Sequence, residues 1–146
     1  MLFISSDHGG FKLKNKIVAY LRAKDIALQD LGPIELNEND DYPIYVAKLA
    51  EKMRNAAEAK GILICRNGVG VSMFANKFSF IRAALSWNGQ HAASSRTDDD
   101  TNVLALPADY ISEEDAMKIV DTWLATPFSG DERHGRRLAE MKDLLS

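Results

Sequence analysis

The chain has 146 residues, of which 46% are apolar and 27% charged, a composition typical of one folded domain and unlike that of a disordered chain. Its formal net charge of -3 argues against nucleic-acid binding as the main function, and its single cysteine excludes an intramolecular disulfide framework and a CxxC metal site. No apolar run approaches the roughly 18 residues of a membrane span, and the first residues lack a basic signal-peptide start, so we expect a cytoplasmic protein without a membrane partner.

In chain order, short apolar runs alternate with segments whose apolar residues fall at helical spacing. The runs predict five strands, over residues 2–6, 26–32, 61–65, 81–87 and 102–106. The helical patterns predict six helices, near residues 11–23, 43–53, 69–77, 88–95, 112–124 and 132–144. This alternation indicates an α/β fold of one domain spanning residues 1–146, with a five-stranded parallel sheet between two helical layers, similar to a Rossmann fold.

Ligands of such sheets bind beyond the carboxyl ends of the strands, and reactive residues gather near the predicted strand ends. The first strand ends in Asp7, His8 and two glycines, and the third ends in Cys65, followed by the loop 66–70. The acidic segment 97–101 ("TDDDT") directly precedes the fifth strand. We expect these three segments to meet at one rim of the sheet.

Each segment also has a purely structural interpretation. A lone cysteine at a strand end is commonly a small buried apolar residue, and a glycine pair such as "GVG" is commonly a tight turn. The aspartate of "DHGG" is a common helix cap, "TDDDT" is typical of a solvated turn, and "RHGRR" (133–137) is typical of a helix surface. However, the turn after Cys65 leads into a helix N-terminus, which favours anions and can lower the pKa of a thiol. The joint arrangement therefore favours a functional site.

Several motifs together resemble one known family. They are "SDHGGFKLK", "DYP", "ILICxNGVGVSxxANK", "IRAAL", "TNVLAL" and "RHxxR", and they resemble the ribose-5-phosphate isomerase B family, which includes galactose-6-phosphate isomerase subunits. The resemblance implies a metal-free interconversion of an aldose phosphate and a ketose phosphate, with no cofactor. It also implies a homodimer or dimer of dimers whose active sites lie between two subunits.

Residue roles follow from this resemblance. Cys65 is the base that moves a proton between neighbouring carbons, and the loop that stabilises the enediolate consists of Arg66, Asn67, Gly68, Val69 and Gly70. Asp7 and His8 match the substrate-binding pair of the family. Arg133 and Arg137 on the C-terminal helix match its phosphate clamp, because guanidinium groups suit phosphate oxygens, and His134 assists them.

The chain departs from the family pattern at three places. Asn67 stands where a threonine or serine is usual, and an amide is a poor proton relay. Asp98, Asp99 and Asp100 replace a His-Asn-Asp sequence, so we expect Asp98 to open the sugar ring and Asp99 to contact substrate. Asp109 replaces a phosphate-binding arginine. Ribose 5-phosphate is therefore the first expected substrate, and the alternatives are another four- to six-carbon sugar or its phosphate, or a non-catalytic sugar-phosphate-binding homologue.

Overall fold

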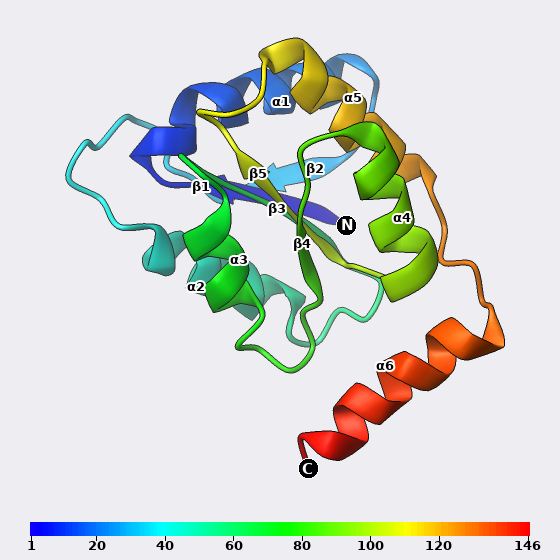
Figure 1. Ribbon diagram of the computed structural model, residues 1–146. Coiled ribbons are helices and arrows are strands. Elements are labelled where there is room, and N and C mark those ends of the chain that lie inside the picture. The colour runs from blue at the N-terminus through cyan, green and yellow to red at the C-terminus, as the bar shows by residue number, and fades with distance from the viewer.

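A computed structural model describes residues 1–146 and contains one five-stranded sheet in which every strand pair is parallel (Figure 1). The strand order is β2-β1-β3-β5-β4. The strands are β1 (Leu2–Ser6), β2 (Leu28–Asp30), β3 (Lys60–Cys65), β4 (Ala83–Leu85) and β5 (Val103–Pro107). The predicted three-layer α/β/α fold is thus confirmed, and β3 lies at the centre of the sheet.

The helices cover both faces of the sheet. In chain order they are the 3-10 turn η1 (His8–Gly10), α1 (Phe11–Ala23), α2 (Tyr42–Met53), α3 (Val69–Ala75), α4 (Gly89–Asp99), α5 (Glu113–Ala125) and α6 (Glu132–Leu144). Figure 1 shows α1, α4 and α5 on one side of the sheet and α2 and α3 on the other. None of these helices combines the length and the apolar character needed to cross a membrane.

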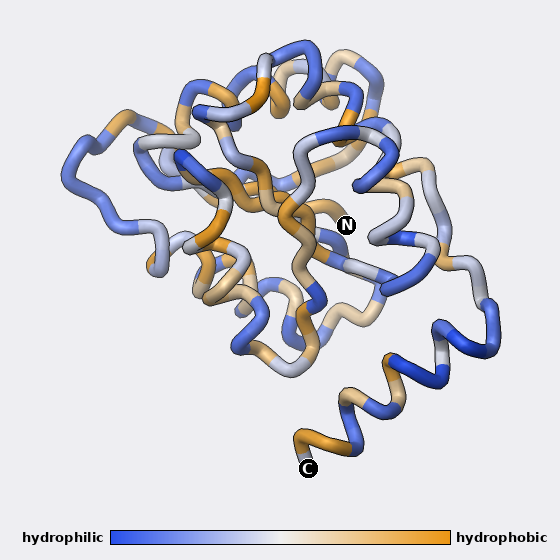
Figure 2. Tube along the Cα trace, in the orientation of Figure 1, coloured by the Kyte–Doolittle hydropathy of each residue, from blue (hydrophilic) through white to orange (hydrophobic).

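Strand β3 shows how the sequence fills both layers. Ile62 and Ile64 belong to the apolar cluster under α1 and α5, whereas Leu63 and Cys65 belong to the cluster under α2 and α3. Successive side chains of a strand point to opposite faces, so a continuous apolar run suits a strand that is buried on both faces. Burying each large apolar side chain contributes about 1.5–3 kcal/mol. Figure 2 shows mostly hydrophobic residues along the central strands and both hydrophobic and hydrophilic residues along the helices.

The predicted element bounds differ from the structure mainly at the sheet edges and at α4. β2 and β4 are three residues each, shorter than predicted, because each is an edge strand with one neighbour. Helix α4 extends to Asp99 rather than ending near residue 95, so the segment "TDDDT" is largely helical. Asp100 ends the helix with a φ of 45° and accepts hydrogen bonds from Arg82 (3.2 Å) and Arg96 (2.9 Å). These two guanidinium groups offset the carboxylates at a helix C-terminus, where negative charge is unfavourable.

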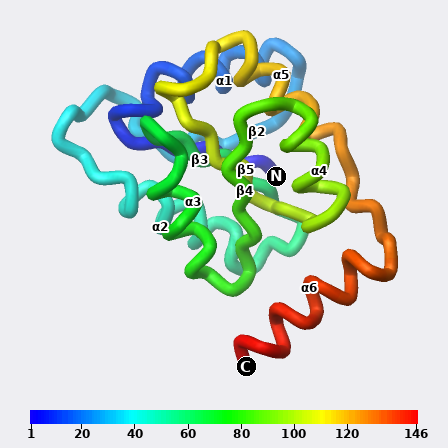
Figure 3. The backbone as a smooth tube through the Cα atoms, viewed as in Figure 1, coloured from blue at the N-terminus to red at the C-terminus, as the bar shows by residue number.

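The C-terminal helix α6 extends away from the rest of the chain, as Figure 3 shows. Its main neighbour is α4, and His134 is its one buried residue. Met141, Leu144 and Leu145 are exposed large apolar side chains near the end of the chain. The helix therefore presents an apolar stripe that the chain itself does not cover.

Candidate active site

The ends of β1 and β3 lie side by side and carry the residues that the sequence singled out. The register pairs Ser6 with Ile64, and the N–H of Asp7 donates to the carbonyl oxygen of Ile64 at 3.3 Å. A Cβ at Gly10 would lie 2.6 Å from that same oxygen, so only glycine allows the loop after β1 to pack so closely on β3. We use the name cysteine site for Asp7, His8, Cys65 and the loop 66–70.

Cys65 is only 4% exposed, and the N–H of Gly68 donates to its Sγ at 3.2 Å. This contact depends on the φ of +73° at Gly68, a left-handed conformation that turns the loop back over the sulfur. An N–H group directed at sulfur stabilises negative charge on it, as a thiolate base requires.

Asn67 lies beside the same sulfur. Its Oδ1 is 3.9 Å from Cys65 Sγ and accepts a hydrogen bond from the N–H of Val69 at 3.0 Å. Two of the five N–H groups of loop 66–70, those of Gly68 and Val69, are thus engaged within the chain. Because the Asn67 oxygen is held by Val69, the amide NH₂ is the part of this side chain that remains available for a ligand.

Asp7 and His8 differ in their surroundings. Asp7 is buried and its Oδ1 accepts the N–H of Gly10 at 3.1 Å. Burial raises the pKa of Asp7, although the hydrogen bond from Gly10 acts against this shift. His8 Nδ1 donates to Asp40 Oδ1 at 2.8 Å, and the His8 backbone N–H donates to the same oxygen at 2.9 Å. The side-chain hydrogen bond to Asp40 raises the pKa of His8 above its ordinary value.

Asp40 was not identified from the sequence. It lies in the polar loop between β2 and α2, next to Asp41, and the composition of this loop does not distinguish one aspartate from the other. In the fold, Asp41 is exposed and forms no side-chain cap, whereas the Asp40 side chain is 4% exposed and bonded to His8. Its position directly before the motif "DYP" was the one available signal.

The side chains of Arg66 and Asp109 form an ion pair at the mouth of the cysteine site, with 3.6 Å between Nη1 and Oδ2. Both side chains are largely exposed. The backbone N–H of Asp109 also donates to the carbonyl oxygen of Arg66 at 2.8 Å. The acidic residue that stands in place of an expected arginine is therefore neutralised by a cation from the loop after β3.

The expectation that segment 97–101 meets Cys65 at one rim is wrong for a single chain. Helix α4 starts near the carboxyl end of the sheet and returns the chain to its amino end, where β5 begins. The register pairs Val103 with Gly61 at the start of β3, and Cys65 with Pro107 at its end. Asp98 and Asp99 therefore lie at the end of the sheet opposite to Cys65.

A second group of expected site residues gathers at that opposite end. His134 is buried, its Nδ1 bonds to Ser129 Oγ at 2.9 Å, and its Nε2 lies 3.8 Å from Asp98 Oδ1. Arg133 pairs with Asp131 at 3.4 Å, and Arg137 is exposed without an ion pair. We use the name arginine cluster for Asp98, Arg133, His134 and Arg137.

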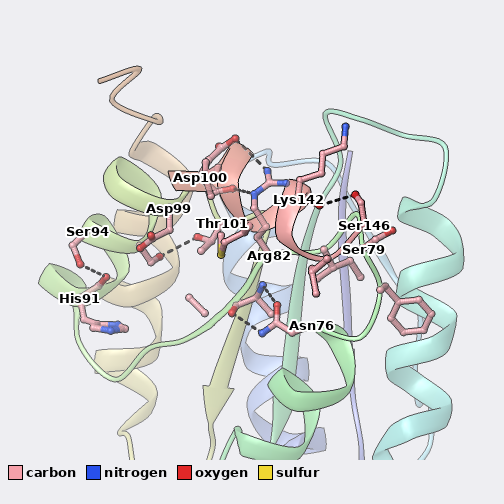
Figure 4. Close-up of a pocket in the computed structure, with 18 residues that line it drawn as sticks. Asn76, Ser79, Arg82, His91, Ser94, Asp99, Asp100, Thr101, Lys142 and Ser146 are labelled. Carbon is pink, nitrogen blue, oxygen red and sulfur yellow. Dashed lines mark hydrogen bonds and ion pairs between the residues drawn. The ribbon is translucent and has the colours of Figure 1, made fainter. Parts of the chain in front are cut away.

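A groove of about 950 Å³ lies between α6, α4 and β4, away from Cys65. Figure 4 shows polar side chains around it, among them Arg82, Asp99 and Lys142, and the apolar side chains of Leu138 and Met141 also line it. Asp99 thus belongs to this groove rather than to the cysteine site. No group of three or more His, Cys, Asp or Glu side chains is arranged to hold a metal ion.

Comparison with known proteins gives a consistent result. The model of the family described as Ribose/Galactose Isomerase matches residues 2–141. The chain is 42% identical over 140 residues to a probable ribose-5-phosphate isomerase B of Mycoplasma pneumoniae, covering 96% of this chain and 91% of that protein. It is 41% identical over 132 residues to ribose-5-phosphate isomerase B of Escherichia coli, covering 90% of this chain and 87% of that protein.

A solved structure supports the same assignment. The crystal structure of ribose-5-phosphate isomerase B from Mycoplasma genitalium with bound ribulose-5-phosphate superposes with a TM-score of 0.92 at 40% identity. The match covers 96% of this chain and 92% of that one. The cysteine site, the parallel sheet and these matches, which extend over nearly the whole chain, agree. The chain belongs to the ribose/galactose isomerase family.

Proposed function

We propose that this protein is an aldose–ketose isomerase that interconverts ribose 5-phosphate and ribulose 5-phosphate in the cytoplasm, with Cys65 as the base. The observation that carries this proposal is the Gly68 N–H directed at Cys65 Sγ, 3.2 Å away, beside Asp7 and His8 at the carboxyl end of the sheet. The names of the relatives and the ribulose-5-phosphate bound to the Mycoplasma genitalium enzyme support the substrate class.

The reaction needs one base and one anion-stabilising loop. The Cys65 thiolate removes the proton from C2 of the open-chain aldose, the electron pair forms the C1–C2 double bond, and the carbonyl oxygen O1 takes the negative charge. After the proton of the C2 hydroxyl has moved to O1, Cys65 returns its proton to C1 and the carbonyl forms at C2. N–H donors of residues 66, 67 and 70 stabilise the oxyanion, each well-placed donor contributing about 3–4 kcal/mol.

Asn67 takes part in this scheme as a hydrogen-bond donor rather than as a proton relay. Its Oδ1 is occupied by Val69 N–H at 3.0 Å, so its NH₂ group is left to face the substrate oxygens. An amide does not exchange protons readily near neutral pH. The proton of the C2 hydroxyl therefore passes to O1 within the enediolate itself, which the NH₂ group holds in place.

We propose further that the active site is shared between two copies of the chain. The cysteine site and the arginine cluster lie at opposite ends of the sheet, so one copy alone does not bring them together. In a two-fold dimer, each partner contributes the same surface to the other, and two identical composite sites result. The uncovered apolar stripe of α6, with Met141, Leu144 and Leu145, gives such a contact an apolar surface to bury.

Within this dimer, the arginine cluster of one copy completes the cysteine site of the other. Arg133 and Arg137 hold the phosphate, with His134 beside them, and Asp98 acts on the ring oxygen of the cyclic sugar. A second substrate remains a candidate because the Asp109 carboxylate forms an ion pair with Arg66. This pairing weakens the positive electrostatic potential at the site. A different sugar phosphate, or an unphosphorylated sugar, would be favoured by this arrangement.

The decisive experiment is a coupled assay of the purified protein with ribose 5-phosphate and a panel of four- to six-carbon aldoses, phosphorylated and not. Turnover of ribose 5-phosphate above all others supports the proposal, preference for another sugar supports the second candidate, and no turnover at all contradicts both. The shared site is tested by mixing Cys65→Ala and Arg137→Ala proteins after dissociation. Mixed dimers then regain one intact site, so activity returns to about a quarter of the wild-type value, whereas a site within one chain regains none.

A further inference from the structure

The loop between β2 and α2 brings one buried carboxylate to the cysteine site. Asp40 Oδ1 accepts two hydrogen bonds from His8, one from the ring Nδ1–H at 2.8 Å and one from the backbone N–H at 2.9 Å. The Asp40 side chain is 4% exposed, and its Oδ2 is buried without a hydrogen-bond partner. Both hydrogen bonds that Asp40 Oδ1 accepts therefore come from His8.

The same pair leaves one ring nitrogen of His8 free. Nδ1 is bound to Asp40, while Nε2 makes no hydrogen bond within the chain, and 26% of the His8 side chain is exposed. A carboxylate that binds one ring nitrogen fixes the tautomer and the orientation of the imidazole and favours its protonated form. The protonated ring then offers Nε2–H as a donor that carries positive charge.

From this geometry we infer that Asp40 is a positioning residue that keeps His8 protonated, so that His8 Nε2–H binds an anionic oxygen of the sugar phosphate. The inference rests on the proposed function for the identity of the ligand. In this inference Asp40 does not contact the substrate; it acts only by orienting and charging the His8 ring. It also gives the cysteine site a cation of its own, which the site needs because Asp109 occupies Arg66.

The charged and titratable groups around this pair come from each neighbouring element. Asp7 at the end of β1 and Asp40 both raise the pKa of His8, whereas Arg66 from the loop after β3 lowers it. Burial is the largest single influence and acts to raise the pKa of Asp40, but the hydrogen bonds and charge of His8, together with the Tyr45 hydroxyl, outweigh it and lower that pKa. Tyr45 of α2 faces the same carboxylate, and burial, followed by the side-chain interaction with Asp40 and the charges of Asp40 and Asp7, raises the pKa of the Tyr45 hydroxyl. Both partners of the pair thus favour their charged forms.

The sign of the pH dependence follows. His8 is protonated below its raised pKa, so its contribution to binding an anion is complete at lower pH and is lost as the pH rises through that pKa. Without Asp40, the pKa of His8 falls toward its ordinary value and the loss occurs at lower pH. At pH values between the ordinary and the raised pKa of His8, therefore, removal of the Asp40 charge removes the cation from the site.

The test compares Asp40→Asn with Asp41→Asn, which removes an equal charge from the neighbouring exposed position. NMR titration of the His8 ring in the unliganded proteins is expected to show a lower pKa in Asp40→Asn than in wild type and in Asp41→Asn. Ribose 5-phosphate is then titrated into each protein across the pH range, a measurement that needs no turnover. At a pH between the two measured His8 pKa values, we expect about tenfold weaker binding by Asp40→Asn, with the pH profile displaced to lower pH.

Either of two results would overturn the inference: an unchanged His8 pKa in Asp40→Asn, or a lowered pKa with an undisplaced binding profile. A larger effect on KM than on kcat supports phosphate as the anion that His8 binds, whereas an effect on kcat alone, with binding unchanged, contradicts the inference. Failure of the proposed function is distinguishable, because it appears as absent turnover in the wild-type protein, whereas the two titrations still report on Asp40.

Discussion

The backbone N–H of Gly68 lies 3.2 Å from Cys65 Sγ, and the loop reaches this position because Gly68 adopts a φ of +73°. A Cβ at Gly68 would clash with Leu85 Cδ1 and lie 3.2 Å from the backbone at Leu106 and Pro107, so a side chain is disfavoured for steric as well as conformational reasons. The neighbouring strand β5 thus helps to fix the loop that binds the thiol. Gly68 therefore links the packing of the loop against the sheet to the hydrogen bond that the thiol of Cys65 receives.

Replacement of Cys65 by Ala is expected to abolish turnover while the protein stays folded. The thiol is the one group placed to carry the proton between carbons, and general base catalysis contributes about 10²–10⁴-fold in rate. Steady-state kinetics measure the loss, and calorimetric titration with ribose 5-phosphate checks that binding persists. If Cys65→Ala keeps most of its activity, Cys65 is not the base.

Replacement of Arg133 or Arg137 by Ala is expected to raise KM for ribose 5-phosphate far more than KM for ribose. Losing one desolvated, hydrogen-bonded charge partner costs about 2–5 kcal/mol, and ribose has no phosphate to lose. Arg136→Ala is the matched control, because Arg136 lies on the same helix but pairs with Glu132 and Glu140. Equal effects of the arginine variants on both sugars would assign the pair to helix packing or to the subunit contact.

The fold could be predicted from the sequence because the central strands are long apolar runs. β1 and β3 are buried on both faces, and the first and last helices begin and end close to the predicted residues. The edge strands were predicted too long, since hydrophobicity reports burial and not the number of paired neighbours. In α4 the polar composition concealed only the last turn of the predicted helix, whose end is stabilised by the pairing of Asp100 with Arg82 and Arg96.

The candidate site was predictable only in part. Cys65, Asp7 and His8 follow strand ends directly, so parallel topology alone brings them together. Asp98 was misplaced because a segment that precedes a strand lies at its amino end, and the sequence pattern does not show which residues a second copy brings near. Asp40 was missed because its contact with His8 spans a loop with no regular pattern.

Replacement of Asp109 by Ala is expected to lower KM for ribose 5-phosphate by about two- to fivefold, the scale of one exposed ion pair. The substitution frees Arg66, whose guanidinium now pairs with Asp109 at 3.6 Å, to face the phosphate. Glu113→Gln is the control, because it removes an equal charge at the start of α5 without touching Arg66. The double variant Arg66→Ala, Asp109→Ala is expected to lose the gain, and persistence of the gain would exclude Arg66.

Replacement of Asp7 by Asn is expected to stabilise the protein near neutral pH while weakening activity. Burial raises the pKa of Asp7, so its ionised form costs folding free energy, and this cost is present above the folded pKa and disappears as the pH falls below the unfolded value. An asparagine Oδ1 still accepts the Gly10 N–H. Thermal unfolding at pH 7 and at pH 3 is the measurement: we expect Tm to rise by a few degrees at pH 7 only. An equal shift at both pH values would contradict this cause.

Replacement of Asp98 by Asn is expected to lower the rate of turnover of ribose 5-phosphate and to leave that of erythrose 4-phosphate unchanged. The pentose phosphate cyclises and must open before isomerisation, whereas the four-carbon phosphate has its C4 hydroxyl blocked and forms no such ring. Asp98 is exposed at the end of α4 and lies 3.8 Å from His134 Nε2, within the arginine cluster that a partner brings to Cys65 in the proposed dimer. Loss of general acid–base catalysis at the ring would cost about 10²-fold or more in rate.

Two alternatives for Asp98 are separated by the same measurement. If the carboxylate only orients His134 and the neighbouring arginines, Asp98→Asn slows both substrates alike, because both carry a phosphate. If Asp98 is a solvated helix-end residue, neither substrate is converted more slowly, as expected for the control Asp99→Asn, whose side chain lines the groove between α4 and α6. Only a lower turnover rate that is confined to the cyclising sugar requires a proton transfer at the ring. Such a result would show that Asp98 performs the ring opening for which the family uses a histidine.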